Sequence, residues 1–275
     1  MRRFGLHTSI AGGLHKSLER GVLLGCDAIQ IFSHNPRGWH TTAISEEEAA
    51  HFKETRMSTG ITPVAAHASY LLNIASPDET IRSRSIAMLK EEMLRADLIG
   101  ADFVVLHTGT AHDNRGLERA AESIKAALGD IEVRTELLLE NTSGKRGDTT
   151  SRIPALAELL LLASGLSTGV CIDSCHAFAA GYDLTSDKGA RELSREVIEH
   201  LGADRVKLVH LNDSRGAHGT GTDRHEHIGK GNIGGKGLSR FLNAEPFKGK
   251  PAILETPRDS DEDDMANLKA ARELK

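Results

Sequence analysis

The sequence predicts an α/β protein built as one closed TIM (β/α)₈ barrel, and three observations predict it. Eight short apolar runs, each typical of a buried strand, recur from one end of the chain to the other. Most intervals between them carry helical patterns, and alternating strands and helices indicate parallel βαβ units. The length of 275 residues is close to that of one such barrel, so residues 1–275 are expected to form a single domain.

The eight predicted strands are bounded by turn residues. In order they cover residues 4–9, 28–33, 62–67, 103–107, 136–141, 169–173, 206–212 and 252–256. Predicted helices lie between several of them. Ser45 to Glu48 fits a capping box before a helix over 49–58. Ser76 is expected to cap the next helix, with Pro77 at its first position. Further helical patterns cover 117–128, 154–164 and 191–201.

One stretch, residues 212–237, departs from this alternation. It is long, polar and rich in glycine, and it follows the seventh strand. Long loops in compact domains are usually functional or disordered, and the presence of Asp223 and His225 favours function. Residues 229–234 match GxGxxG by letter, but they follow a polar loop and not a strand. They are therefore weak support for a dinucleotide site.

Composition excludes several classes of protein. The formal net charge of −5 argues against a strongly basic, non-specific nucleic-acid binder. No apolar run approaches the roughly 18 residues of a membrane span, and the N-terminus has no signal-peptide pattern, so no membrane partner is expected. Three cysteines without a CxxC pair indicate a reducing compartment, and we expect a cytoplasmic protein. Cys171 shares strand parity with Asp173 and should lie one layer deeper in the barrel.

Ligand-type side chains stand at the ends of most predicted strands and in the long loop. They are His67, His107, Glu140, Asp173, His176, His210, Asp223, His225 and Glu255. The carboxyl ends of parallel barrel strands meet at one rim, where active sites of such barrels lie. One zinc ion takes about four ligands, so nine ligands suit two or three ions that share a bridging carboxylate.

Any one of these positions, taken alone, is more often a helix cap or a hydrogen-bonded core residue than a ligand. As a set they are harder to explain without metal, because several unpaired carboxylates on one rim would repel each other and be costly to bury. Cations relieve that cost. His7 and His34, at the ends of the first two strands, and His227 keep both interpretations open.

Bound metal would also change the charge of the rim. Three divalent ions would add about +6 to the net charge of −5, which leaves roughly +1 with the positive charge concentrated in one cleft. Basic residues fall in loops predicted for the same rim: Arg37, Lys145, Arg146, Arg224, Lys230, Lys236 and Arg258. An anionic substrate is therefore compatible with an acidic chain.

Long motifs in these same loops resemble the endonuclease IV family of apurinic/apyrimidinic (AP) endonucleases. They run in order over nearly the whole chain: Gly5-Leu6-His7-Thr8-Ser9, Asn35-Pro36-Arg37-Gly38-Trp39, His67-Ala68-Ser69-Tyr70-Leu71-Leu72-Asn73, His107-Thr108-Gly109, Leu139-Glu140-Asn141-Thr142, Asp173-Ser174-Cys175-His176, His210-Leu211-Asn212-Asp213-Ser214, Asp223-Arg224-His225-Glu226-His227 and Leu254-Glu255-Thr256-Pro257. The acidic segment after Pro257 resembles the family less.

The resemblance implies a TIM barrel with three zinc ions per chain. One zinc would be held by His67, His107 and Glu140; a second by Glu140 as the bridge with Asp173, His210 and Glu255; and a third by His176, Asp223 and His225. Glu140 would be the catalytic bridge.

The implied reaction is hydrolysis of the phosphodiester 5′ to an abasic site. Attack by a metal-bridging hydroxide would leave a 3′-hydroxyl. The implied partner is double-stranded DNA with abasic sites or blocked 3′ ends, bound by a monomer. Arg37 and Tyr70 match positions at which family members insert side chains into damaged DNA.

Two other functions are compatible with parts of the sequence. A sugar isomerase or epimerase on a similar divalent-metal barrel would need fewer metal ligands than nine. A non-enzymatic metal-binding or nucleic-acid-binding barrel would not explain why the carboxylates gather at the catalytic rim. Metal stoichiometry separates these alternatives. The sequence leaves open the metal in each site and the relative activity on abasic sites, blocked 3′ ends and oxidised bases.

Overall fold

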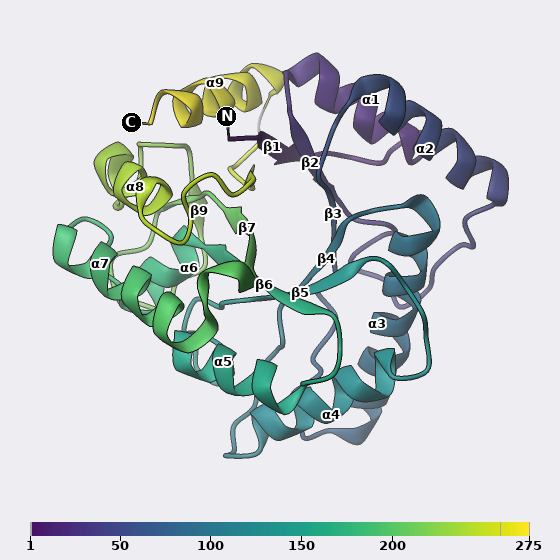
Figure 1. Ribbon diagram of the computed structural model, residues 1–275, viewed down its shortest axis with the longest axis horizontal. Coiled ribbons are helices and arrows are strands. Elements are labelled where there is room, and N and C mark those ends of the chain that lie inside the picture. The colour runs from purple at the N-terminus through teal and green to yellow at the C-terminus, as the bar shows by residue number, and fades with distance from the viewer. Residues whose placement is uncertain (1, 259, 275) are drawn as a thin grey trace.

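The computed structural model describes residues 2–258 and 260–274, and it contains the predicted closed barrel. Eight parallel strands follow the order β1-β10-β7-β6-β5-β4-β3-β2 around the barrel (Figure 1). They are β1 (Phe4–His7), β2 (Ala28–Ile31), β3 (Val64–His67), β4 (Phe103–Leu106), β5 (Glu136–Glu140), β6 (Thr168–Asp173), β7 (Val206–His210) and β10 (Ala252–Leu254). All eight predicted strands are therefore confirmed.

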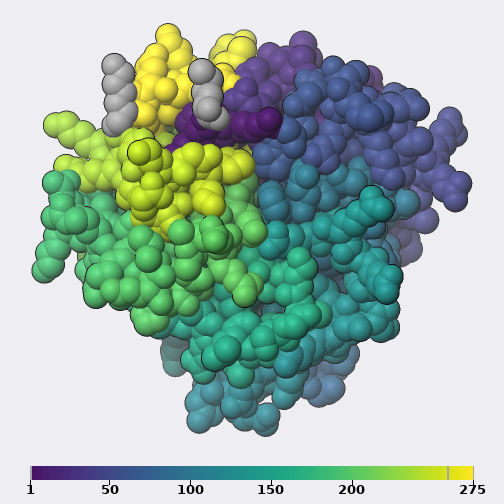
Figure 2. Space-filling view, viewed as in Figure 1, coloured from purple at the N-terminus to yellow at the C-terminus, as the bar shows by residue number. Residues whose placement is uncertain are grey.

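Helices surround the barrel as an outer ring, except the short α6, which lies inside that ring directly after β6 (Figure 1). They are α1 (His15–Leu24), α2 (Glu46–Thr59), α3 (Glu79–Ile99), α4 (Gly116–Leu128), α5 (Ile153–Leu162), α6 (Ser174–Ala179), α7 (Asp187–Glu196), α8 (Gly234–Asn243) and α9 (Asp261–Glu273), with a π-helical turn η1 (Val197–Leu201) and a 3₁₀ turn η2 (Ala203–Arg205). Figure 2 shows α9 in yellow beside the purple N-terminal segment, so the last helix lies next to the first strand at the surface. Among the described helices, none is long and apolar enough to cross a bilayer.

Helix capping confirms one prediction and corrects another. Ser45 caps α2, where its side chain accepts a hydrogen bond from the amide of Glu48. The prediction that Ser76 caps the third helix with Pro77 at its first position is wrong. Asp78 is the cap, and one of its carboxylate oxygens accepts from the amides of Thr80 and Ile81 at 2.8 and 3.1 Å. The carboxylate accepts hydrogen bonds from two amides that have no partner within the helix. Its negative charge also interacts favourably with the positive end of the helix dipole.

The long loop after β7 is more ordered than predicted. It contains a two-stranded antiparallel sheet, β8 (Asp213–Ser214) with β9 (His225–Glu226), and α8 begins at Gly234 before the predicted end of the loop. Asp213 organises this segment, because its carboxylate accepts hydrogen bonds from the amides of Gly231, Ile233 and Gly234. The loop is therefore anchored at its far end by one buried side chain.

An apolar layer fills the barrel directly below the rim. It is formed by Ala28, Ala65, Val105, Leu138, Cys171, Leu208 and Ile253. On β1 the corresponding position is Gly5, where a Cβ would lie 1.9 Å from the carbonyl oxygen of Ala28. Cys171 in this layer is fully buried, which confirms its predicted depth.

Strand parity explains what lies above that layer, because residues two apart on a strand point to the same side. Each strand contributes one polar side chain two residues after its layer residue: His7, Gln30, His67, His107, Glu140, Asp173, His210 and Glu255. The barrel therefore carries a polar layer at its C-terminal rim, supported by a packed apolar one.

Candidate metal centre

The nine predicted ligand residues meet at this rim. Six come from the polar layer, His176 from the first turn of α6, Asp223 from the loop before β9, and His225 from β9 itself. Their ligand-type atoms form three groups, each with all atoms within 4.8 Å of one another: His67 with His107 and Glu140; Glu140 with Asp173, His210 and Glu255; and His176 with Asp223 and His225. These groups have the same membership as the three ligand sets implied by the family resemblance.

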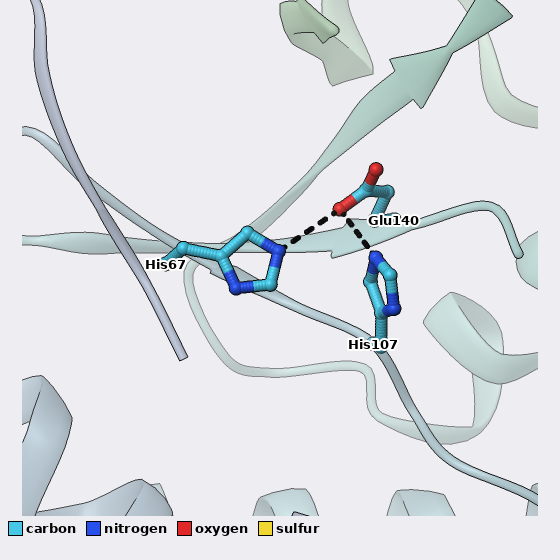
Figure 3. Close-up of side chains that lie close together, drawn as sticks. All are labelled: His67, His107 and Glu140. Atoms are coloured by element: carbon cyan, nitrogen blue, oxygen red, sulfur yellow. Dashed lines mark hydrogen bonds and ion pairs between the residues drawn. The ribbon is translucent and has the colours of Figure 1, made fainter. Parts of the chain in front are cut away.

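Glu140 lies at the centre of the cluster and is fully buried. Its Oε2 faces the Nε2 atoms of His107 at 2.9 Å and His67 at 3.5 Å, as Figure 3 shows. Its Oε1 faces the Nδ1 atoms of His210 at 2.8 Å and His176 at 3.3 Å. One carboxylate therefore divides its two oxygens between two groups of imidazoles, which is the geometry required of a bridge.

Backbone carbonyls orient three of the imidazoles. The Nδ1 atoms of His67, His176 and His225 lie 2.7, 3.0 and 2.9 Å from the carbonyl oxygens of Ala68, Asn141 and Glu255. A carbonyl only accepts, so each Nδ1 carries the hydrogen, and in the neutral ring Nε2 is left with a lone pair. The Nε2 of His225 is buried without a hydrogen-bond partner among the described residues. Metal-ligating histidines have the same arrangement.

The cluster strongly attracts positive charge. Burial opposes ionisation of Glu140 and Glu255, but His210 and other nearby imidazoles hold the pKa of the Glu140 carboxyl well below its usual range. The same surroundings lower the pKa of Glu255 to about 2. Burial likewise opposes charge on His176, yet Asp173 and other carboxylates raise its pKa well above the usual value. Anionic carboxylates packed against imidazoles are suited to bind divalent cations, with release of protons.

Asparagine side chains hold Asp173 in place. Its Oδ2 accepts from the Nδ2 of Asn212 at 2.6 Å, and its backbone amide donates to the Oδ1 of Asn141 at 2.8 Å. Its Oδ1 accepts from the amide of His176 at 2.7 Å, so Asp173 also caps α6. Asn141 and Asn212 occur within motifs of the sequence, but no role was predicted for them.

Gln30 is a further residue of the site that sequence analysis missed. Its side chain donates to Glu255 Oε1 at 2.6 Å and accepts from His210 Nε2 at 2.8 Å, and it contacts His7 Nδ1 at 3.1 Å. The sequence feature that could have identified Gln30 is its polar side chain within the otherwise apolar strand β2. His7 borders the site without joining a ligand group, and burial lowers its pKa to about 4, so it is neutral at pH 7.

The donor set fits zinc. Imidazole nitrogens and carboxylate oxygens are zinc ligands, and the buried Nε2 of His225 has no hydrogen-bond partner among the described residues. Asp173, Cys175 and His225 form a fourth close group. Burial raises the pKa of the Cys175 thiol to about 12, and its Sγ lies 3.8 Å from the carbonyl oxygen of Arg224. In these surroundings the Cys175 thiol is protonated and faces a backbone carbonyl.

A cavity of about 560 Å³ opens above the cluster. Besides ligand-type residues, it is lined by Tyr70 and by Arg215, Arg224 and Arg258. Of the basic residues predicted for this rim, Arg224 and Arg258 thus border the site, and Lys145 lines an adjoining cavity of about 480 Å³. Arg215 pairs with Glu226, and Arg258 pairs with Asp261 and Asp264, so carboxylates offset part of the positive charge at the cavity.

The two predicted DNA-contacting residues lie in neighbouring loops at the rim. Tyr70 is 64% exposed, and its ring meets Phe32 edge-on with centroids 5.1 Å apart. Arg37 is exposed in the loop after β2 and is not among the residues lining the cavity. Burial raises the pKa of the Tyr70 hydroxyl, the charge of Glu255 adds to this effect, and that of Arg37 opposes it.

His34 and His227, left open by the sequence, lie outside the three ligand groups. His34 is buried and pairs with Glu92, its Nε2 lying 2.8 Å from the carboxylate. The Nδ1 of His227 accepts from the Nδ2 of Asn267 at 2.9 Å. Each ring therefore has one structural partner, and the Nδ1 of His34 is buried without one among the described residues.

Comparison with known proteins gives consistent full-length matches. A family model described as "Xylose isomerase-like TIM barrel" matches residues 18–274. "Probable endonuclease 4" of Halothermothrix orenii is 40% identical over 97% of this chain and 97% of its own. The protein of the same name from Cenarchaeum symbiosum is 39% identical over 98% of both chains.

Solved structures of the same family and fold also match this chain. The crystal structure of endonuclease IV from Thermus thermophilus matches with a TM-score of 0.89 and 37% identity, over 98% of this chain and 97% of the other. A D-tagatose 3-epimerase-like protein also matches, with a TM-score of 0.72 over 99% and 96% of the two chains. At 20% identity, that match shows the shared fold alone.

Proposed function

Because the chain belongs to the endonuclease IV family of AP endonucleases, we propose that it is a zinc-dependent DNA repair enzyme that cuts abasic DNA. The reaction is hydrolysis of the phosphodiester on the 5′ side of the abasic nucleotide. The bond between phosphorus and the 3′-oxygen breaks, water supplies a hydroxyl to phosphorus, and its remaining proton goes to the departing oxygen. The products are a 3′-hydroxyl and a 5′-phosphate.

The observation that carries this proposal is the convergence of nine ligand-type side chains into three groups, two of which share Glu140. In the proposed site, Glu140 is a ligand in the first two groups. The third group consists of His176, Asp223 and His225. Zinc bound there would supply Lewis acidity toward the phosphoryl oxygens and a lowered pKa for water, which phosphodiester hydrolysis at neutral pH needs.

The protein's own groups hold that arrangement rigid. Carbonyls fix the ring orientation of His67, His176 and His225, while Gln30 ties His210 to Glu255. Preorganised charge of this kind is effective because no reorganisation is needed during the reaction. The arginines at the cavity rim then favour approach of the phosphate backbone.

The proposed substrate is double-stranded DNA with an abasic site or a blocked 3′ end, bound by a monomer. An abasic nucleotide has no base to stack, so its rotation out of the helix costs less than flipping an intact nucleotide. Tyr70, largely exposed above the cavity, and Arg37 in the next loop are the side chains proposed to enter the distorted stack.

Cleavage of a defined duplex tests the proposal. Purified protein is incubated with an end-labelled duplex that carries one abasic analogue, with and without a chelator. We expect a single cut 5′ to the analogue, with a product that a polymerase can extend from its 3′-hydroxyl, and loss of cutting after chelation. A metal-loaded, folded protein that leaves this duplex intact would contradict the proposal.

The alternative, a sugar isomerase or epimerase, is compatible with the fold, but no described contact favours it over hydrolysis. Nine ligand-type residues exceed what one metal-assisted proton transfer needs. Incubation of the same preparation with ketose sugars serves as the parallel assay. Isomerisation without cleavage of abasic duplex would favour this alternative.

A further inference from the structure

A buried carboxylate outside the metal cluster bonds to two separate loops. Glu92, in the middle of α3, is 3% exposed. Its Oε1 and Oε2 accept from the backbone amide of Ser69 at 3.0 and 3.2 Å, and its Oε1 lies 2.8 Å from Nε2 of His34. His34 Nδ1 is buried without a hydrogen-bond partner among the described residues. Because the carboxylate is the acceptor, His34 donates from Nε2.

These partners connect Glu92 to the two proposed DNA probes. Ser69 immediately precedes Tyr70 in the β3–α3 loop (residues 68–78), and His34 lies three residues before Arg37 in the β2–α2 loop (residues 32–45). The loops are also joined directly, since Ser69 Oγ donates to the carbonyl of Pro36 at 2.7 Å. The same hydroxyl accepts from the amide of Leu71 at 3.2 Å, which fixes the turn around Tyr70.

Helix α3 holds the β2–α2 loop at further points. Arg95, one turn beyond Glu92 and also buried, donates to the carbonyls of Ser33 and Thr42, each at 2.6 Å. These carbonyls flank the exposed part of the loop. The guanidinium of Arg84 lies 4.4 Å from the ring centre of Trp39. A rigid helix therefore positions both ends and the middle of the loop.

Two side chains of this loop, Trp39 and Ile44, pack against the hydrophobic core while partly buried. A cavity of about 360 Å³ separates the loop from the start of α1, and the loop residues that line the cavity include His34, Asn35 and Thr42. On that side the hydrogen bonds to α3 add to what holds the loop in place. A buried carboxylate that accepts several donors is well suited to this task, because its loss leaves buried donors unpaired.

We infer that Glu92, together with His34, is a positioning residue that couples the Arg37 and Tyr70 loops. The inference rests on the proposed function for its consequence on DNA binding, but the coupling of the loops is a separate physical claim. Two side chains that enter the DNA base stack together bind better when the protein holds them at a fixed separation. Glu92 touches neither the metal ligands nor the cavity above them.

The test compares Glu92→Met, Glu92→Gln and the control Glu158→Met. Met removes the acceptor, whereas Gln can still accept from both Ser69 and His34 through one oxygen. Glu158 is an exposed glutamate within α5, away from both loops. In Glu92→Met we expect backbone amide exchange to quicken at least about tenfold in both loops. Glu92→Gln should retain most of the protection, and Glu158→Met should exchange like the parent protein.

DNA binding and turnover provide the second readout. For Glu92→Met we expect KM for abasic duplex to rise about tenfold while kcat at saturating DNA and metal content change little. A folded Glu92→Met protein that loosens neither loop, or only one, would overturn the coupling. If Glu92→Met does not fold, amide exchange in His34→Leu tests the coupling instead, because this variant keeps the hydrogen bond between Glu92 and Ser69. Faster exchange at Ser69 and Tyr70 supports coupling, and a change confined to residues 32–45 overturns it.

Failure of the proposed function would look different. If Arg37→Ala and Tyr70→Ala bind abasic duplex as the parent does, the assignment of these residues as DNA probes is wrong. The exchange data on Glu92→Met would still report on the coupling.

Discussion

Replacement of Glu140 by Gln is expected to lower cleavage of abasic duplex by roughly 100-fold to 1,000-fold. Gln has nearly the same shape, so packing around this fully buried side chain should survive. It removes the negative charge shared by the two proposed metal groups and replaces one oxygen by a donor. That donor would face the imidazoles of either His107 and His67 or His210 and His176. Binding of the DNA, which depends on the rim and the loops, should fall much less.

Single-turnover cleavage with saturating enzyme measures this effect separately from binding. Glu136→Gln is the matched control, since Glu136 begins the same strand at the opposite end of the barrel and pairs only loosely with Lys207, 3.8 Å away. It should cleave like the parent protein. Near-normal turnover in Glu140→Gln would remove Glu140 from the mechanism.

Tyr70→Ala should weaken binding to abasic duplex by about tenfold or more, with little effect on intact duplex. Loss of a stacking ring costs ~1–3 kcal/mol per base contact, and an intact stack leaves no gap for the ring to fill. The fold should tolerate the change, because Tyr70 is mostly exposed and its described ring contacts are Phe32 and His67 at the rim. Metal content should be unchanged, since Tyr70 belongs to none of the ligand groups.

Titration of the two duplexes by anisotropy gives both affinities, and Tyr70→Phe is the control that keeps the ring. Tyr70→Phe should bind abasic duplex nearly as well as the parent. If Tyr70→Ala loses metal or unfolds, the residue has a packing role. If it weakens abasic and intact duplex equally, Tyr70 is a general DNA contact and does not recognise damage.

The sequence predicted the strands and the ligand-type residues because one physical rule governs both. Each strand is short and apolar, and its inward-facing residues alternate, so the residue that follows the core layer must lie at the rim. For this reason His67, His107, Glu140, Asp173, His210 and Glu255 could be assigned to one site before their distances were known. Their roles as metal ligands remain proposals.

Features set by tertiary contacts could not be predicted in this way. In the sequence, Gln30 is only a polar residue within an apolar strand. Its role at the site comes from hydrogen bonds to Glu255 and His210, which lie far away in the sequence. Helix α8 begins within a glycine-rich segment of low helical propensity, ordered by the carboxylate of Asp213. Glu92 lies on an ordinary helical pattern, and only the fold shows that it bonds to two loops.

The metal content of the purified protein tests the central claim most directly. Elemental analysis together with the protein concentration from amino-acid analysis gives the number of ions per chain. Nine ligand-type residues in three groups, two of which share Glu140, predict about three zinc or zinc-like ions per chain. A preparation that is folded, prepared without chelators and reproducibly carries a single ion would contradict the three-ion centre and the proposed mechanism that depends on it.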